Sequence, residues 1–191
     1  MKRSAFAPLL LLAGLAAFAV PAGWAKVLLS ADEALALAFP GCTIERDTIY
    51  LTEAEMQTAR EQAGTEPLSA VVHPYRARRA GEAPAPCGTA YFDSHRVRTL
   101  AETVMIAIDP ESQIVRVEVL SFDEPLDYLP RDEWYAQFAG RALVPDTELG
   151  RAIRPVTGAT LTARATTDAA RRALALHRLI AAREARPGTS P

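Results

Sequence analysis

The stretch from residue 102 to residue 122, ETVMIAIDPESQIVRVEVLSF, decides the fold. Its first third, residues 102–108, is apolar and rich in β-branched side chains, and residues 114–122 alternate between apolar and polar. Both patterns are typical of β-strands. The intervening Asp109-Pro110-Glu111-Ser112 has the composition of a tight turn. We therefore expect an antiparallel hairpin over about 101–122.

Three further segments upstream of the hairpin have strand-like composition: residues 43–51, 68–75 and 88–97. Residues 76–86, rich in Arg, Ala, Gly and Pro, are expected to form a loop. No regular βαβ spacing and no Gly-rich nucleotide loop occurs, which argues against a doubly wound parallel sheet.

Two helices are predicted upstream of the hairpin. Ser30 caps the first, which Pro40-Gly41 ends. Thr52 and Glu55 form a capping box that predicts a helix over 53–63, with Gly64 after its end.

Two more helices are predicted downstream. A short one follows Pro130, ends at Gly140 and brings Trp134, Tyr135 and Phe138 close to one face. Aromatic residues at this spacing most often belong to a core, and stacking on a ligand ring is the alternative. A long helix without Gly or Pro begins near Thr160 and ends near residue 185. The whole pattern predicts an α+β domain, a curved antiparallel sheet flanked by helices.

The first 25 residues have the layout of a secretory signal peptide. Two basic residues precede the apolar run PLLLLAGLAAFAV at 8–20, and Gly23-Trp24-Ala25 offers small residues for cleavage. The run is shorter than the roughly 20 residues that span a bilayer, although an uncleaved anchor remains the alternative. We expect residues 1–25 to be removed, residues 26–186 to form one domain and residues 187–191 to be a tail. The protein is then periplasmic or otherwise extracytoplasmic.

Charge and residue usage exclude several functions. The formal net charge is −2, and the sequence has no basic stripe of the kind that would predict nucleic-acid binding. The three histidines, His73, His95 and His177, have no metal-ligand spacing. The sequence contains no GxSxG elbow for a serine hydrolase and no CxxCH for covalent haem. Cys42 and Cys87 allow either one disulfide or two buried thiols.

The chemically informative segment is Val156-Thr157-Gly158-Ala159-Thr160-Leu161-Thr162 at the start of the long helix. A helix N-terminus offers unpaired N–H groups and a partial positive charge, so a phosphate is favoured there. The small residues Gly158 and Ala159 leave the backbone accessible. Thr157, Thr160 and Thr162 add hydroxyl groups that can donate to phosphate oxygens or be esterified. An ordinary N-cap that binds nothing explains the same local pattern.

The segment Thr157-Gly158-Ala159-Thr160 resembles the flavinylation motif of the FMN-binding domain family. That motif is an Asp, two variable residues and then Ser/Thr-Gly-Ala-Thr. Such domains occur in the C subunit of the sodium-pumping NADH:quinone oxidoreductase and the G subunit of the Rnf complex. The resemblance implies that Thr160 receives FMN through a phosphodiester bond. It also implies a partner, a flavin transferase that uses FAD and a divalent metal and releases AMP.

The resemblance extends over about 88–177, through the segments YFDSH (91–95), ETVM (102–105), VLSFDEPLDYL (119–129) and QFAG (137–140). It implies that Ser121 and Glu124 lie near the flavin, and Leu161 is expected to contact its ring. One position departs from the family: Arg154 stands where the motif has its acidic residue.

These observations predict an exported flavoprotein that carries electrons between a membrane-associated donor and another redox protein. Two alternatives keep the same fold: noncovalent FMN, with Arg154 pairing with the phosphate, or a binding or assembly module without cofactor. A flavin-dependent reductase would need a convergent acid or base, and none stands out.

Overall fold

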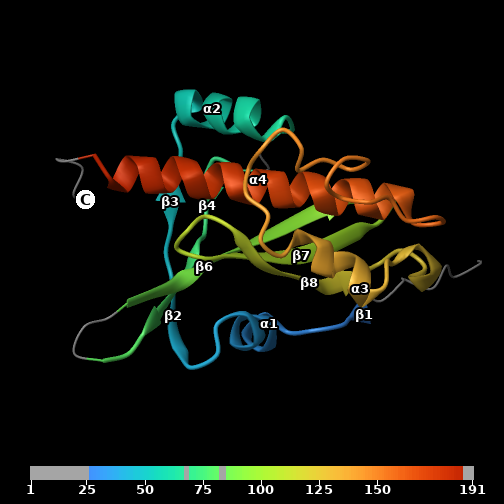
Figure 1. Ribbon diagram of the computed structural model, residues 1–191, viewed down its shortest axis with the longest axis horizontal. Helices are drawn as coiled ribbons and strands as arrows, with labels where there is room; N and C mark the ends of the chain where they lie inside the picture. The colour runs from blue at the N-terminus through green and yellow to red at the C-terminus, as the bar shows by residue number, and fades with distance from the viewer. Residues whose placement is uncertain (1–25, 67–68, 82–84, 187–191) are drawn as a thin grey trace, which may run out of the picture.

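The computed structural model describes residues 26–66, 69–81 and 85–186 (Figure 1). The predicted signal peptide (residues 1–25) and the predicted tail (187–191) lie outside these ranges. Within them, no helix combines the length and the apolar character needed to cross a bilayer.

The centre of the fold is a six-stranded antiparallel sheet with the strand order β1-β8-β7-β6-β5-β2. Its strands in chain order are β1 (Lys26–Val27), β2 (Cys42–Arg46), β5 (Tyr75–Arg79), β6 (Ala85–Arg96), β7 (Ala101–Ile108) and β8 (Ile114–Phe122). A separate two-stranded sheet pairs β3 (Ile49–Tyr50) with β4 (Val71–Val72).

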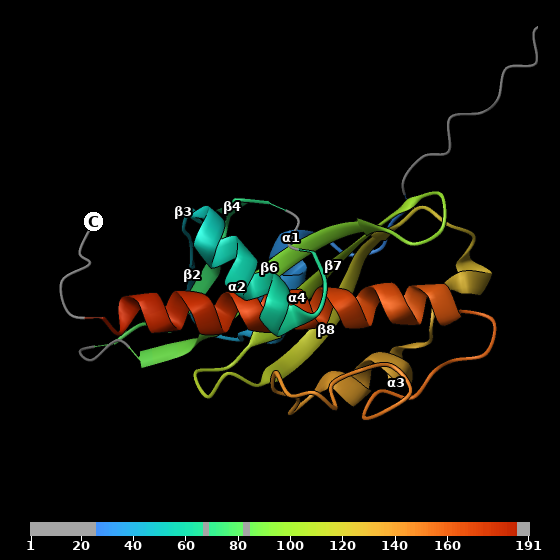
Figure 2. The ribbon, with the colours of Figure 1, turned by 90° about the horizontal axis from the view of Figure 1, so that it is seen from above.

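Helices cover both faces of the large sheet (Figures 1 and 2). The helical elements are α1 (Ala31–Ala38), α2 (Glu53–Ala63), η1 (Leu126–Tyr128), α3 (Asp132–Tyr135), η2 (Ala136–Phe138) and α4 (Thr160–Glu184). Helix α4 runs along one face, α1 lies on the other, and α2 packs on the outer side of α4 over its C-terminal half.

The predicted hairpin is confirmed. Strands β7 and β8 pair in antiparallel register from Glu102 opposite Phe122 to Ile108 opposite Ile114. Val104 and Ile106 of β7 are buried in the cluster that includes α4, whereas Met105 is buried with α1. Because both faces of β7 are covered, its sequence is an unbroken apolar run and not an alternating one. The prediction of an α+β domain with an antiparallel sheet and a long C-terminal helix is likewise confirmed.

The helix predictions hold with small changes. Ser30 and Thr52 each form the two reciprocal hydrogen bonds of a capping box, and Gly64 ends α2 in the left-handed region at φ +69°. The predicted helix after Pro130 is a single α-turn followed by the 3₁₀ turn η2. Its three aromatic side chains, Trp134, Tyr135 and Phe138, are buried in the core on the α4 side of the sheet.

Two strand predictions upstream were wrong in extent. The predicted strand 43–51 is divided between β2 and β3, which belong to different sheets, and within the described residues 69–75 only Val71–Val72 and Tyr75 are extended strand. The loop predicted over 76–86 was also wrong, because β5 continues to Arg79 and β6 begins at Ala85. Ala77 is buried and pairs on both sides, with Ile44 and Gly88, while the neighbouring arginines are more exposed. Pairing with β2 on one side and β6 on the other thus stabilises β5 as a strand, although its arginine-rich composition does not predict one.

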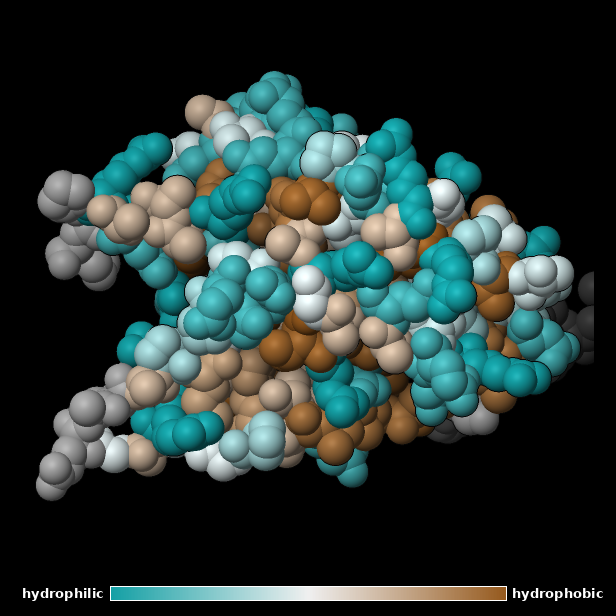
Figure 3. All heavy atoms as spheres, viewed as in Figure 1, coloured by the Kyte–Doolittle hydropathy of each residue, from teal (hydrophilic) through white to brown (hydrophobic). Residues whose placement is uncertain are grey.

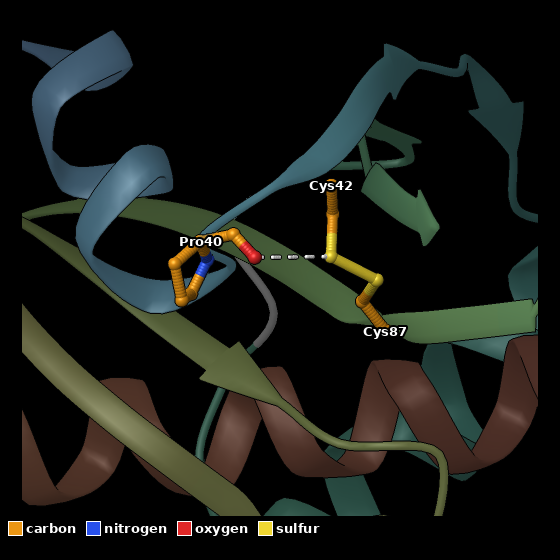
Figure 4. The surroundings of a disulfide bond; sticks show 3 residues. All are labelled: Pro40, Cys42 and Cys87. Carbon is orange, nitrogen blue, oxygen red and sulfur yellow. Dashed lines mark hydrogen bonds between the residues drawn. A yellow bond between two sulfur atoms is a disulfide. The ribbon is translucent and has the colours of Figure 1, made fainter. Parts of the chain in front are cut away.

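The two cysteines form a disulfide (Figure 4). It joins β2 to β6, the strands on either side of β5, and closes a loop with a sequence separation of 45. Restricting an unfolded loop of that length contributes about 4 kcal/mol to stability in the chain-entropy model. Close to it, Gly88 allows β6 to approach its neighbours, since a Cβ there would lie 2.4 Å from the Ile108 carbonyl oxygen.

Candidate functional site

The start of α4 is open at its positive end. Ala159 occupies the N-cap position, no side chain caps the helix, and its first turn contains no acidic residue. The N–H groups of the first turn therefore carry the positive end of the helix dipole without a local carboxylate to offset it. This arrangement favours an anion.

A pocket of about 210 Å³ lies at this helix end. Its lining consists of Arg98, Tyr128 and the five consecutive residues Gly158, Ala159, Thr160, Leu161 and Thr162. The structure thus brings five of the residues predicted from the sequence to one cavity. It adds two that were not predicted, from the turn after β6 and from η1.

Thr160 presents its side chain at the pocket. The residue is exposed, and its hydroxyl donates a 3.3 Å hydrogen bond to the Val156 carbonyl. Gly158 precedes it at φ +86°, a backbone conformation that glycine adopts readily, and no atom lies within 4 Å of where its Cβ would be. The glycine therefore lets the chain turn into α4 and keeps the approach to Thr160 clear. Leu161, 49% exposed, lies beside it.

Thr162 has a structural role as well. Its side chain is buried, and its hydroxyl donates a 2.6 Å hydrogen bond to the Tyr128 carbonyl. This bond ties the first turn of α4 to η1 and fixes Tyr128 at the pocket. The two hydroxyls differ in burial and in bond length: that of Thr162 is buried in a 2.6 Å bond, whereas Thr160 is exposed and its bond to the Val156 carbonyl is 3.3 Å long.

Glu124 shapes the pocket indirectly. This buried residue lies outside the lining, and its Oε1 accepts hydrogen bonds from the N–H groups of Arg98 (3.2 Å), Thr99 (2.7 Å) and Leu100 (2.9 Å). The bonds from Thr99 and Leu100 hold the pKa of Glu124 below its usual value. The carboxylate thereby fixes the turn that carries Arg98 to the pocket.

Arg98 and Tyr128 are the two lining residues that come from outside the segment at the helix start. The Arg98 guanidinium carbon lies 4.8 Å from the centroid of the Tyr128 ring, within the range of a cation–π contact. Tyr128 belongs to the 119–129 segment that carried the family resemblance. Arg98 had no signal in the sequence, because its place depends on the Glu124 carboxylate 26 residues further along the chain.

Two predicted residues lie apart from the lining. Thr157 is exposed in the loop before α4. Ser121 is half-buried in β8, where it pairs with Thr103 on one side and Val27 on the other. Neither lines the pocket, and their proposed contacts with a cofactor stay predictions.

Arg154 is also outside the lining and is turned to another partner. Its backbone N–H and its Nε both donate to Gln137 Oε1, at 3.0 and 3.4 Å, and its carbonyl accepts from Trp134 Nε1 at 2.7 Å. The cation that lines the pocket is Arg98, not Arg154.

A buried hydrogen-bonded array begins one turn further along α4. His95 lies between two carboxylates, with Nδ1 2.9 Å from Asp93 and Nε2 2.9 Å from Glu102. Arg172 binds Asp93, and the Thr166 hydroxyl donates to Glu102 at 3.4 Å. Burial acts to lower the pKa of His95, but the bonds to the two carboxylates outweigh it and raise that pKa to about 9. The array therefore contains an imidazolium at neutral pH.

A hollow larger than the pocket at the start of α4 lies elsewhere. About 480 Å³ in volume, it follows β8 between α1 and α3 and is lined mainly by apolar side chains such as Leu37, Val115 and Ala136. Leu37 is 52% exposed, and Figure 3 shows apolar atoms at the surface in the region of α1. This groove contains none of the predicted site residues, so size alone does not mark the site. Within the described ranges, no group of three or more His, Cys, Asp or Glu residues is arranged to hold a metal ion.

Comparison with known proteins agrees with the pocket at the start of α4. The model of the FMN-binding domain family matches residues 101–175, a range that contains β7, β8, α3 and the pocket residues 158–162. No curated protein and no solved structure matches the chain. The pocket also suits the cofactor chemically, since an uncapped helix end and an arginine suit a phosphate. Residues 101–175 of this chain therefore match the FMN-binding domain family, and this match indicates FMN as the cofactor.

Proposed function

We propose that the protein is an exported electron carrier whose FMN is joined to Thr160 through a phosphodiester. One observation carries this proposal: the exposed Thr160 hydroxyl lies at the uncapped start of α4, in a pocket of an FMN-binding domain. An ester on this oxygen puts the phosphate directly at the positive end of the helix, where its charge is stabilised.

The attachment needs a flavin transferase as partner and FAD as donor. The threonine oxygen forms a bond to the phosphorus of the FMN half, and the pyrophosphate bond to AMP breaks. The threonine proton is released, and AMP is the leaving group. Once attached, FMN supplies the redox chemistry, while the protein positions the ring and tunes its potential.

Export is supported by two independent features. The N-terminal sequence has the pattern of a signal peptide, and the Cys42–Cys87 disulfide is typical of oxidising compartments. A covalent bond suits such a place, because a cofactor that dissociates outside the cytoplasm is difficult to replace. The carrier would then accept electrons from a membrane-associated donor and pass them to another exported protein.

The test is intact-mass measurement after coexpression with a flavin transferase. We expect the wild-type chain and Thr157→Ala to gain the mass of one FMN, less one water, and Thr160→Ala to gain none. Thr157 is a matched control because it is an exposed threonine three residues away, outside the pocket lining. Flavin covalently bound to Thr160→Ala would place the acceptor elsewhere and refute the proposed linkage.

Arg154 gives a specific reason to keep a second candidate, a domain that binds FMN without a covalent bond. If the transferase requires the acidic residue that Arg154 replaces, the wild-type chain stays unmodified but still binds free FMN. Arg154→Asp would then gain covalent flavin under the same conditions. A chain that is colourless after transferase treatment and after incubation with FMN would instead support the cofactor-free module.

A further inference from the structure

The cation at the pocket has no acidic partner in the part of the chain that the structure describes. No described carboxylate lies within 4.0 Å of the Arg98 guanidinium, whereas other arginines, among them Arg76, Arg151 and Arg172, are ion-paired. The nearby Glu124 is engaged with three N–H groups of the turn. Arg98 is thus exposed, held over Tyr128 and available to an anion.

The position of Arg98 is fixed from two sides. Glu124 holds the backbone of the turn at residues 98–100, and the Tyr128 ring supports the guanidinium. Tyr128 is in turn tied to α4 by the hydrogen bond from Thr162. A side chain restrained in this way loses less conformational entropy when it binds an anion.

The start of α4, with its unpaired N–H groups and Thr160, lines the same pocket. Two positive features, a guanidinium and a helix end, therefore converge on one cavity of about 210 Å³. A guanidinium can bind two oxygens of one phosphate at the same time, which a lysine ammonium cannot reproduce.

We propose that Arg98, together with the start of α4, binds the phosphate group of FMN and so gives the pocket its preference for FMN over riboflavin. This inference rests on the proposed function and names the residue that recognises the phosphate. Glu124 and Tyr128 act as positioning residues for that guanidinium.

The first test separates phosphate recognition from the covalent bond. In the Thr160→Ala background, flavin fluorescence titrations would measure the dissociation constants of FMN and riboflavin. We expect Arg98→Ala to weaken FMN binding about 10- to 100-fold, the range for a hydrogen-bonded charge pair, and to leave riboflavin binding within about threefold. The FMN dissociation constant of Arg98→Lys should lie between those of the Thr160→Ala parent and Arg98→Ala. Arg96→Ala is the matched control, an exposed arginine two residues away that does not line the pocket.

Equal losses for FMN and riboflavin would show that Arg98 acts on the ring or on the fold and would overturn the inference. Unchanged FMN binding in Arg98→Ala would overturn it as well.

A second test does not need noncovalent binding. In the chain loaded by the transferase, the phosphorus-31 resonance of the phosphodiester should move in Arg98→Ala and stay in place in Arg96→Ala. An unmoved resonance in Arg98→Ala overturns the inference while leaving the proposed function intact. Absence of any flavin on the wild-type chain is the distinct result that contradicts the proposed function.

Discussion

Arg172 of α4 donates two hydrogen bonds of 2.8 Å to the Asp93 carboxylate of β6, one from Nε and one from Nη2. Both side chains are at least nine-tenths buried. The helix that carries the pocket is therefore joined to the sheet by a buried ion pair as well as by apolar packing.

Removing the negative partner should destabilise the fold strongly. Asp93→Asn leaves the Arg172 guanidinium buried without its counter-charge and also takes one carboxylate from His95. We expect a loss of about 3–5 kcal/mol in the free energy of unfolding, measured by urea denaturation. Glu66→Gln, which breaks the exposed pair with Arg60, should cost less than about 1 kcal/mol. Similar losses in the two variants would contradict a structural role for the buried pair.

His95 should make stability depend on alkaline pH. Its pKa is raised from 6.5 to about 9 in the folded protein, so the folded state binds the proton more tightly than the unfolded state. The stabilisation is fully present below pH 6.5 and is lost as the pH rises through about 9. Its upper limit is about 3 kcal/mol, and partial solvent access reduces it.

The measurement is the urea midpoint from pH 6 to pH 10 for the wild-type chain and His95→Gln. The glutamine variant keeps hydrogen-bonding capacity but cannot titrate, so its midpoint should change less over this range. His177 is a matched control, because burial lowers its pKa and it has no carboxylate hydrogen-bond partner among the described residues. A wild-type midpoint that stays constant to pH 10 would disprove the imidazolium at His95.

The disulfide should stabilise the fold without being required for flavin attachment. The paired substitutions Cys42→Ser and Cys87→Ser should lower the free energy of unfolding by about 4 kcal/mol, an estimate from the length of the closed loop. Cys87 lies near one end of β6 and the turn carrying Arg98 follows the other, roughly 30 Å away at the rise of a strand. Intact mass after transferase treatment should therefore still show one FMN. If the double variant folds stably but accepts no flavin, the prediction is contradicted, and the disulfide then affects the pocket at the other end of β6.

The sequence was most informative where structure depends on neighbours in the chain. The hairpin at 101–122, the capping box at Thr52 and the long helix from Thr160 follow from local patterns, and the structure confirms them. The residues Gly158 to Thr162 were found for the same reason, since they are consecutive at a helix start.

Residues whose roles depend on distant partners escaped prediction. Arg98 reaches the pocket through Glu124, and β5 is a strand because β2 and β6 pair with it on both sides. His95 had no recognisable motif. The carboxylate of Glu102 reaches the His95 ring only when β6 pairs with β7, opposite the bond that the ring makes with Asp93 of its own strand. Such sites combine side chains from separate elements, and a one-dimensional pattern does not contain that geometry.

Helix α4 has 25 residues and is therefore about 37 Å long, and Thr160 is its first residue. Figure 1 shows that this helix runs along the elongated molecule and starts near one end of it. A redox centre at such an end offers only a small surrounding surface for docking, so two large proteins compete for it. On the proposed function, the electron donor must dissociate before the acceptor binds. Turnover would then proceed through two successive binary complexes and not through a ternary complex of donor, carrier and acceptor.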